Sequence, residues 1–234
     1  MTPVESLGFA HFLSQTDAVG RAVLALLLVL SVASWYLILT KSVRGWLARR
    51  RAAAFLKRFW DAESLAQAMQ LAAQGGADDA FAALAREAHA AADSVQDGRA
   101  RLAAAGGTTE YLVRVLRNRI NQETARVEHG LAMLASAGSV SPYVGLFGTV
   151  WAIYHALVSI GLSGQGTLDK VAGPVGEALI MTALGLAVAI PAVLAYNFFT
   201  RRNRVWLAEL DAFAHDLLNL LSTGSMSAVP VRGR

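Results

Sequence analysis

One acidic residue, Glu177, lies at the edge of an apolar run that is long enough to cross a lipid bilayer. The run covers residues 178–200, and the six residues before Glu177 carry no charge. A carboxylate at membrane depth costs about 2.5–3.5 kcal/mol, and such residues usually face a bundle interior or a water path. We therefore favour a place for Glu177 on or beside a proton pathway. The alternative is that Glu177 lies at the start of the helix and reaches the lipid headgroups.

Small and polar side chains recur every three or four residues along a second apolar run, so they share one helix face. This stripe consists of Gly138, Ser141, Gly145, Thr149, Ala152, Ala156 and Ser159, and the third run repeats the pattern with Ala178, Thr182, Gly185 and Ala189. Such stripes let helix backbones approach closely in lipid, so a packing seam explains either stripe alone. The hydroxyl groups of Thr149 and Thr182 favour a pore lining, because hydroxyls both donate and accept hydrogen bonds.

Glu177 and the threonines are predicted to have separate roles. Glu177 and Thr182 are about 140° apart around one helix, at about 100° per residue. They therefore cannot both point along one pore axis. We expect the threonines to line the path, and Glu177 to act as a buried polar anchor or a proton station.

The elements that position these residues are membrane helices. The chain has 234 residues, of which 55% are hydrophobic and only 16% are charged, against about 25% charged in soluble domains. Three runs, at 22–40, 130–168 and 178–200, reach the roughly 20 residues that a span needs. We predict an all-α integral membrane protein with three transmembrane helices, two of them extended into a cytoplasmic helical region. The expected segments are a periplasmic N-terminus (1–20), span one (21–40), a cytoplasmic helical region (41–130), span two (131–162), a periplasmic loop (163–173), span three (174–200), and a cytoplasmic helix and tail (201–234).

Basic residues gather at two borders of the predicted spans. Lys41, Arg44, Arg49, Arg50 and Arg51 follow the first span, and Arg201, Arg202 and Arg204 follow the third. Cytoplasmic loops carry such an excess, so the N-terminus is predicted to be periplasmic and the C-terminus cytoplasmic. The net charge of +4 could suggest nucleic acid, but this border placement indicates membrane lipids as the partner and no nucleic acid.

The cytoplasmic region is predicted to be helical throughout. Asp61 and Ser64 offer N-caps and Gly75-Gly76 a C-cap for a short alanine-rich helix. A second helix is expected from about Asp79 to Ala104, and a third from Thr108 or Thr109 running without a break into the second span. We expect no hydrophobic core here that is separate from the membrane helices.

The sequence offers little for other chemistry. Cysteine is absent, and the five histidines show no ligand spacing, so neither a metal site nor a cofactor is expected. His155 could relay protons, but a packing role is favoured. No Ser/His/Asp grouping has a basis in spacing, and an enzyme is the least supported class.

A resemblance to a known family is carried by residues 141–153, 154–157, 173–179, 182–186 and 189–193, with Ser34-Trp35, 40–43 and 211–216 in support. With these residues the second and third spans resemble the MotA/TolQ/ExbB proton-channel family, and within it the ExbB branch is the nearest. The resemblance covers all three spans, whereas the cytoplasmic helices match only in character. One departure is Ala152, where the family usually has glycine.

The resemblance implies a partner set that composition and spacing do not give. It implies a homo-pentamer whose second and third helices line a pore around an ExbD-like single-span partner. A TonB-like protein would bind outside, near the first span, and Thr149, Glu177 and Thr182 match the family's functional polar positions. The expected function is a proton-channel subunit of a TonB-ExbB-ExbD-type inner-membrane motor that energises outer-membrane uptake, for example of iron-siderophores or haem. A TolQ-type subunit of the Tol-Pal envelope system and a purely structural scaffold remain as alternatives.

Overall fold

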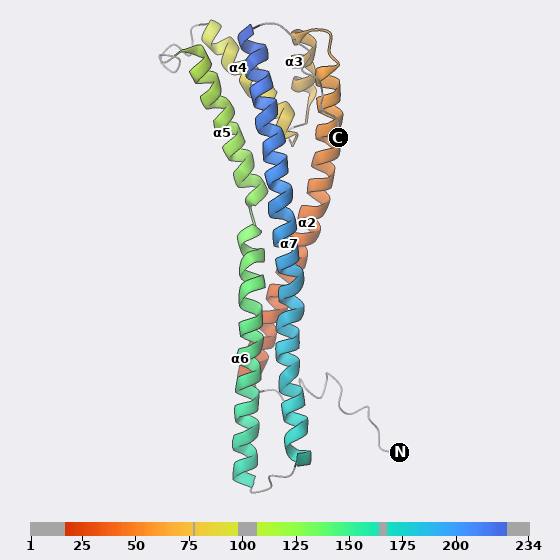
Figure 1. Ribbon diagram of the computed structural model, residues 1–234, viewed down its shortest axis with the longest axis vertical. Helices are drawn as coiled ribbons and strands as arrows, with labels where there is room; N and C mark the ends of the chain where they lie inside the picture. Colours follow the sequence, from red (N-terminus) through yellow and green to blue (C-terminus); the bar gives the residue numbers. More distant parts are fainter. Residues whose placement is uncertain (1–16, 77, 98–106, 164–167, 224–234) are drawn as a thin grey trace. The chain divides into compact units, whose positions relative to one another are not determined.

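The structure is a computed structural model that describes residues 17–76, 78–97, 107–163 and 168–223 (Figure 1). Helices occupy nearly all of this part of the chain, and it contains no strand. They are α2 (Ala18–Trp60), α3 (Leu65–Gln74), α4 (Ala80–Gln96), α5 (Thr108–Glu128), α6 (Leu131–Ser163) and α7 (Leu168–Thr223). Three stretches, Ala18–Trp60, Thr108–Leu162 and Ala178–Ser222, are long and apolar enough to cross a membrane. The prediction of an all-α membrane protein is confirmed.

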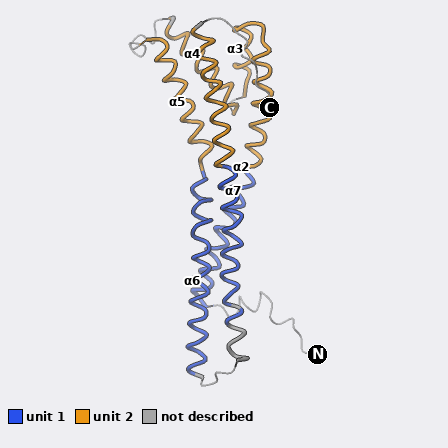
Figure 2. Tube along the Cα trace, in the orientation of Figure 1, with its two compact units in different colours: residues 1–40, 130–199 blue, residues 41–129, 200–234 orange. Residues whose placement is uncertain are grey.

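The chain divides into two compact units (Figure 2). Unit 1 contains residues 1–40 and 130–199, and unit 2 contains residues 41–129 and 200–234. Two helices, α2 and α7, contribute residues to both units. The extension of α2 was expected, whereas the second extended helix was expected to be the one that runs from Thr108 into the second span.

The expected continuous helix from Thr108 into the second span is wrong. The helix α5 ends at Glu128 and α6 begins at Leu131. Gly130 between them has a φ of 80°, a left-handed conformation that glycine adopts without the steric cost that a side chain brings. By contrast Pro142 does not interrupt α6 but lies inside it, as membrane helices tolerate.

The third membrane helix also begins earlier than its apolar run suggests. Residues 168–173, predicted as part of a loop, form the first turns of α7. Pro174 therefore does not mark a helix start. It removes only its own N–H from the helical ladder, and membrane helices commonly accommodate this.

Local capping in unit 2 follows the sequence closely. The Ser64 Oγ accepts from the Gln67 N–H at 3.3 Å, and Gly75 caps the end of α3. The Asp79 Oδ1 accepts from the N–H groups of Phe81 and Ala82 at 3.1 and 3.3 Å. The expected continuation of α4 to residue 104 lies outside the described residues beyond residue 97.

Unit 2 has its own hydrophobic core, so the expectation that it would lack one is wrong. Phe59 is fully buried, and its ring lies 5.5 Å from Phe55 and 5.2 Å from Phe213. Phe81 from α4 joins the same cluster, 5.5 Å from Phe213. The aromatic side chains come mostly from α2 and α7, and the alanine-rich helices α3 and α4 supply short side chains that pack closely against them. Sequence patterning missed this core because its parts are far apart in the chain.

Unit 1 is built differently. Its small buried clusters are Val23, Leu27 and Met181, and Leu131, Leu134 and Phe199. Many large apolar side chains face outward from its helices, among them Leu28, Tyr36, Phe147, Tyr154 and Leu194. Outward apolar faces on long helices are what a membrane span presents to lipid or to neighbouring spans.

Candidate functional site

The closest approach in unit 1 is between the backbones of α6 and α7. A Cβ placed on Gly145 would lie 2.6 Å from the Met181 carbonyl oxygen, and one on Gly185 would lie 2.6 Å from the Ser141 carbonyl oxygen. Either position therefore has room for a hydrogen only. The two glycines fix the seam at which the polar side chains of both helices meet.

Thr149 and Thr182 form a hydroxyl pair at this seam. Their Oγ1 atoms are 2.6 Å apart. The Thr149 Oγ1 also lies 3.1 Å from the Gly145 carbonyl oxygen and 3.0 Å from the Ala178 carbonyl oxygen. Thr149 is buried, with 5% of its surface exposed, whereas Thr182 is half-buried. The pair thus connects an enclosed hydroxyl to one that is accessible from outside the seam.

The hydrogen count sets the direction of these bonds. A threonine hydroxyl has one proton to donate, and a carbonyl oxygen can only accept. If the Thr149 hydroxyl donates to the carbonyl of Gly145 or Ala178, the Thr182 hydroxyl donates to the Thr149 oxygen. Both hydroxyl protons then form hydrogen bonds. If Thr149 donates to Thr182, neither carbonyl receives its proton. The first arrangement makes more hydrogen bonds and is the one we assign.

The two stripes occupy the seam over most of their length. Gly138, Ser141, Gly145, Thr149, Ala178, Gly185 and Ala189 are buried, Ala152, Ala156 and Thr182 are half-buried, and Ser159 is exposed. The stripe therefore opens toward the end of α6. The hydroxyls of Ser141 and Ser34 are buried without a hydrogen-bond partner among the described residues. Both side chains lie within the packed helices, out of reach of a neighbouring subunit.

Glu177 can be placed only by its backbone. It belongs to α7, directly before Ala178, whose carbonyl oxygen lies 3.0 Å from the Thr149 Oγ1. Its side chain lies outside the described residues. Its predicted role stays a prediction.

A second polar cluster, at the start of α2, was not singled out from the sequence. The Trp151 Nε1 donates to the Asp17 Oδ2 at 2.7 Å, and the His155 Nε2 lies 4.0 Å from the same oxygen. The Asp17 Oδ1 accepts from the Gly20 N–H at 2.8 Å. Asp17 therefore caps α2 and ties its first turn to α6. The position of Asp17, directly before an apolar run, was the available sequence signal for the cap. The hydrogen bond from Trp151 has no such signal, because the two residues are 134 positions apart.

Hydrogen bonding holds the pKa of Asp17 below its usual range. The largest cause is the hydrogen bond from Trp151, and the next is the bond from the Gly20 N–H. Burial opposes them, and the nearby His155 and Arg21 lower the pKa further. Asp17 is thus stabilised in its charged form.

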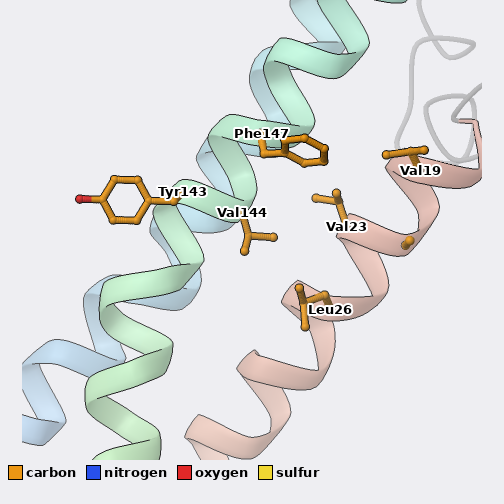
Figure 3. Close-up of a pocket in the computed structure, with 7 residues that line it drawn as sticks. Val19, Val23, Leu26, Tyr143, Val144 and Phe147 are labelled. Carbon is orange, nitrogen blue, oxygen red and sulfur yellow. The ribbon is translucent and has the colours of Figure 1, made fainter.

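An apolar depression lies beside this contact (Figure 3). It has a volume of about 390 Å³ and lies between α2 and α6, lined by Val19, Val23, Leu26, Val144 and Phe147 among others. The Val144 side chain points toward α2, whereas the Tyr143 ring points away from it. The depression leaves part of the α2–α6 contact open, although Val23 packs beside Gly148, where an added Cβ would lie 3.0 Å from the Val23 Cγ1.

The basic residues at the borders of the predicted spans differ in their contacts. In unit 2 the Lys41 Nζ donates to the Val127 carbonyl at 2.8 Å, and an Arg49 Nη2 donates to the Arg202 carbonyl at 3.1 Å. Arg50 lies over the Trp46 ring, 3.9 Å from its centroid. Arg44, Arg51, Arg201 and Arg204 are exposed. Their predicted contact with lipid stays a prediction. Among the described residues no three potential metal ligands come together.

Comparison with known proteins decides the family. The profile of the MotA/TolQ/ExbB proton channel family matches residues 62–212. The chain belongs to this family. It is 38% identical to the biopolymer transport protein ExbB of Xanthomonas campestris pv. campestris (strain B100) over 231 residues, 95% of this chain and 91% of that protein. It is 43% identical to the ExbB of Neisseria meningitidis serogroup A over 202 residues, 86% and 91% of the two chains. The Tol-Pal system protein TolQ of Pseudomonas aeruginosa is 33% identical over 230 residues, 93% and 94% of the two chains.

Membership of this family explains the character of the site. The family is one of membrane proton channels and not of enzymes. Its matched region includes the α6–α7 seam with the Thr149–Thr182 pair. A seam of glycines and hydroxyls is consistent with that class.

Proposed function

We propose that this chain is an ExbB-type proton-channel subunit of a bacterial inner-membrane motor. The motor uses the proton motive force to energise active transport across the outer membrane, such as iron-siderophore or haem uptake. The N-terminus is periplasmic and the C-terminus cytoplasmic, with the basic residues after α2 and α7 on the cytoplasmic side. The family and the ExbB relatives support this assignment.

The observation that carries the proposal is the Thr149–Thr182 hydroxyl pair, held at 2.6 Å in an otherwise apolar seam. Moving one charge through 100 mV releases about 2.3 kcal/mol of free energy. A narrow polar path is needed for the protein to use this free energy. Thr182 is the accessible member, so it presents its oxygen to a titrating group. Thr149 fixes the orientation of Thr182 through the backbone carbonyls. Ser141 extends the polar face by eight residues, about 12 Å along α6.

The complete path needs more than one chain. The outward apolar residues of α6 and α7 suit contact with neighbouring subunits. In keeping with the family resemblance, five copies surround the single spans of an ExbD-like partner, whose aspartate carries the proton. A TonB-like protein binds outside against α2. Glu177 acts as a polar anchor or a proton station in the same path.

Replacing Thr182 with valine tests the proton path. Valine keeps the shape of the side chain and removes its hydroxyl, and Thr182→Ser is the matched control that keeps the hydroxyl. We expect Thr182→Val to assemble normally and lose iron-limited growth, with serine retaining most of it. Subunit counting by native mass spectrometry and co-purification of a single-span partner verify assembly. If the valine variant assembled and grew normally, the proton path would be contradicted and the structural-scaffold alternative would remain.

The TolQ relative makes the Tol-Pal pathway the second candidate, because it too matches nearly the whole chain. Deleting the gene separates the two. An ExbB-type subunit is expected to be required for growth on chelated iron. A TolQ-type subunit would instead leave that growth intact and make the cells sensitive to detergent.

A further inference from the structure

Unit 2 contains a groove that proton conduction does not use. It has a volume of about 510 Å³ and is lined by one face of α2, the end of α3 and the start of α4. Its α2 side presents Arg50, Arg51 and Arg58, and its floor includes the buried Phe55. On the far side lies Gly76, where an added Cβ would meet nothing within 4 Å.

The three arginines of this groove have no anionic partner among the described residues. All three are exposed, and none forms an ion pair within the part of the chain that the structure describes. The Arg58 Nε donates to the Ala54 carbonyl at 3.2 Å, which leaves its terminal nitrogens available. The acidic residue of the groove, Asp79, uses its Oδ1 to cap α4. The groove therefore presents guanidinium groups to an anion from outside.

The spacing of the arginines distinguishes the kinds of anion. Arg51 and Arg58 are seven residues apart, which places them on the same face of α2 and about 10 Å apart along its axis. One phosphate group would need donors that converge on a point. An extended peptide rises about 3.3 Å per residue, so carboxylates three residues apart match this separation. The apolar floor and the open space at Gly76 suit the peptide's intervening backbone.

The position of the arginines argues against lipid headgroups. Lys41 begins the segment after the predicted span, and Arg51 and Arg58 follow it by about 15 and 25 Å along α2. The headgroup layer on one side of a bilayer is only about 5–8 Å thick. Both side chains thus start well beyond the layer that a headgroup occupies, which also argues against the lipid contact predicted for Arg51 from the sequence.

We propose that this groove binds an extended acidic peptide segment of a partner protein, with carboxylates three residues apart pairing with Arg51 and Arg58. The binding is governed by charge and so weakens with ionic strength. It does not depend on the assignment of the proton path.

The test measures binding of a fluorescein-labelled peptide, Glu-Ala-Ser-Glu-Ala-Ser-Glu, to the full chain in phosphatidylcholine nanodiscs by anisotropy. We expect R51E/R58E to weaken binding about tenfold or more. The matched control is R117E/R204E, which changes two exposed arginines of unit 2 outside the groove by the same charge. A second pair, R51Q/R58Q, should give a smaller loss in the same direction. Thermal denaturation of each variant verifies that it is folded.

The outcomes separate the possible ligands. A peptide of the same composition with its three glutamates adjacent should bind several-fold more weakly. Equal binding by R51E/R58E and R117E/R204E would overturn the proposal. Displacement of the peptide by inorganic phosphate at the same ionic strength would point to a phosphate site. Loss of peptide binding when phosphatidylglycerol is added to the nanodisc would point to lipid, and either result also overturns it.

Discussion

The two units of this chain are held together by different interactions. In unit 1 the helices α6 and α7 meet at Gly145 and Gly185, where the backbones touch, and at one hydroxyl pair. In unit 2 the helices enclose large aromatic rings around the fully buried Phe59. Apolar burial drives association in water, whereas lipid is as apolar as the side chains and close backbone packing must act instead. Shortening a buried side chain should therefore destabilise unit 2, and adding side-chain atoms at the glycine contact should destabilise unit 1.

The largest expected effect is the truncation of Phe59 to alanine in unit 2. The ring is fully buried and lies within 5.5 Å of Phe55, Trp60 and Phe213. Such a truncation costs about 3–5 kcal/mol. Hydrogen exchange in α3 and α4 should speed up accordingly. The control is Val205→Ala, at a half-exposed position of the same unit, which should change exchange little. Similar exchange in both variants would contradict the aromatic core.

The converse change is Gly145→Ala in unit 1. Its one added carbon would lie 2.6 Å from the Met181 carbonyl oxygen, so α6 and α7 must separate at a cost of about 1–3 kcal/mol. Thermal denaturation in detergent should show a lower midpoint. Gly161→Ala on the same helix has no atom within 4 Å and is the matched control. Equal midpoints for the two variants would contradict the backbone contact.

A smaller effect is expected from acid at the Asp17 contact. The pKa of Asp17 is lowered in the folded chain, chiefly by the bond from Trp151. Its contribution is therefore present above the unfolded pKa of about 4 and is lost as the pH falls through the folded value. The carbon-13 NMR signal of the Asp17 carboxyl group should show this acid transition in the native chain. In Trp151→Phe the change should occur at higher pH, because the main stabilising bond is gone, and an unchanged profile would remove Trp151 as its cause.

The smallest effect is expected from an exposed ion pair of unit 2. An Arg126 Nη2 lies 2.7 Å from the Asp78 Oδ1, but the two side chains are 49% and 72% exposed. Exposed pairs contribute about 0–1 kcal/mol. Asp78→Ala should therefore shift the denaturation midpoint far less than Phe59→Ala, and 1 M salt should abolish the difference from the native chain. A larger shift in the denaturation midpoint would show that ion pairs stabilise unit 2 as much as its aromatic rings do.

The sequence predicted those features that depend on local pattern. The three spans follow from run length, and Ser64 was placed as a cap because its hydroxyl replaces a missing backbone partner. The small-residue stripes were predicted because helical spacing alone puts Gly145 and Thr149 on one face. The spacing did not show which residues of the two stripes would contact each other. Thr149 and Thr182 are 33 residues apart, and their contact depends on the loop between them.

Features that join distant segments could not be predicted. The core of unit 2 unites Phe55 and Phe213, and the α2–α6 contact unites Asp17 and Trp151, each across most of the chain. The break before α6 was missed for another reason. Gly130 lies within an apolar run, and nothing local distinguishes a glycine that packs inside a helix from one that ends it.

The shallow depression between α2 and α6 has a mechanical consequence. It leaves the first turns of α2 joined to α6 at few points, namely the Asp17–Trp151 hydrogen bond and the Val23 side chain beside Gly148. The buried apolar contact of α2 is with Met181 of α7, through Val23 and Leu27. A force applied to the start of α2 is therefore transmitted to α7 through buried side chains and to α6 chiefly through one polar bridge.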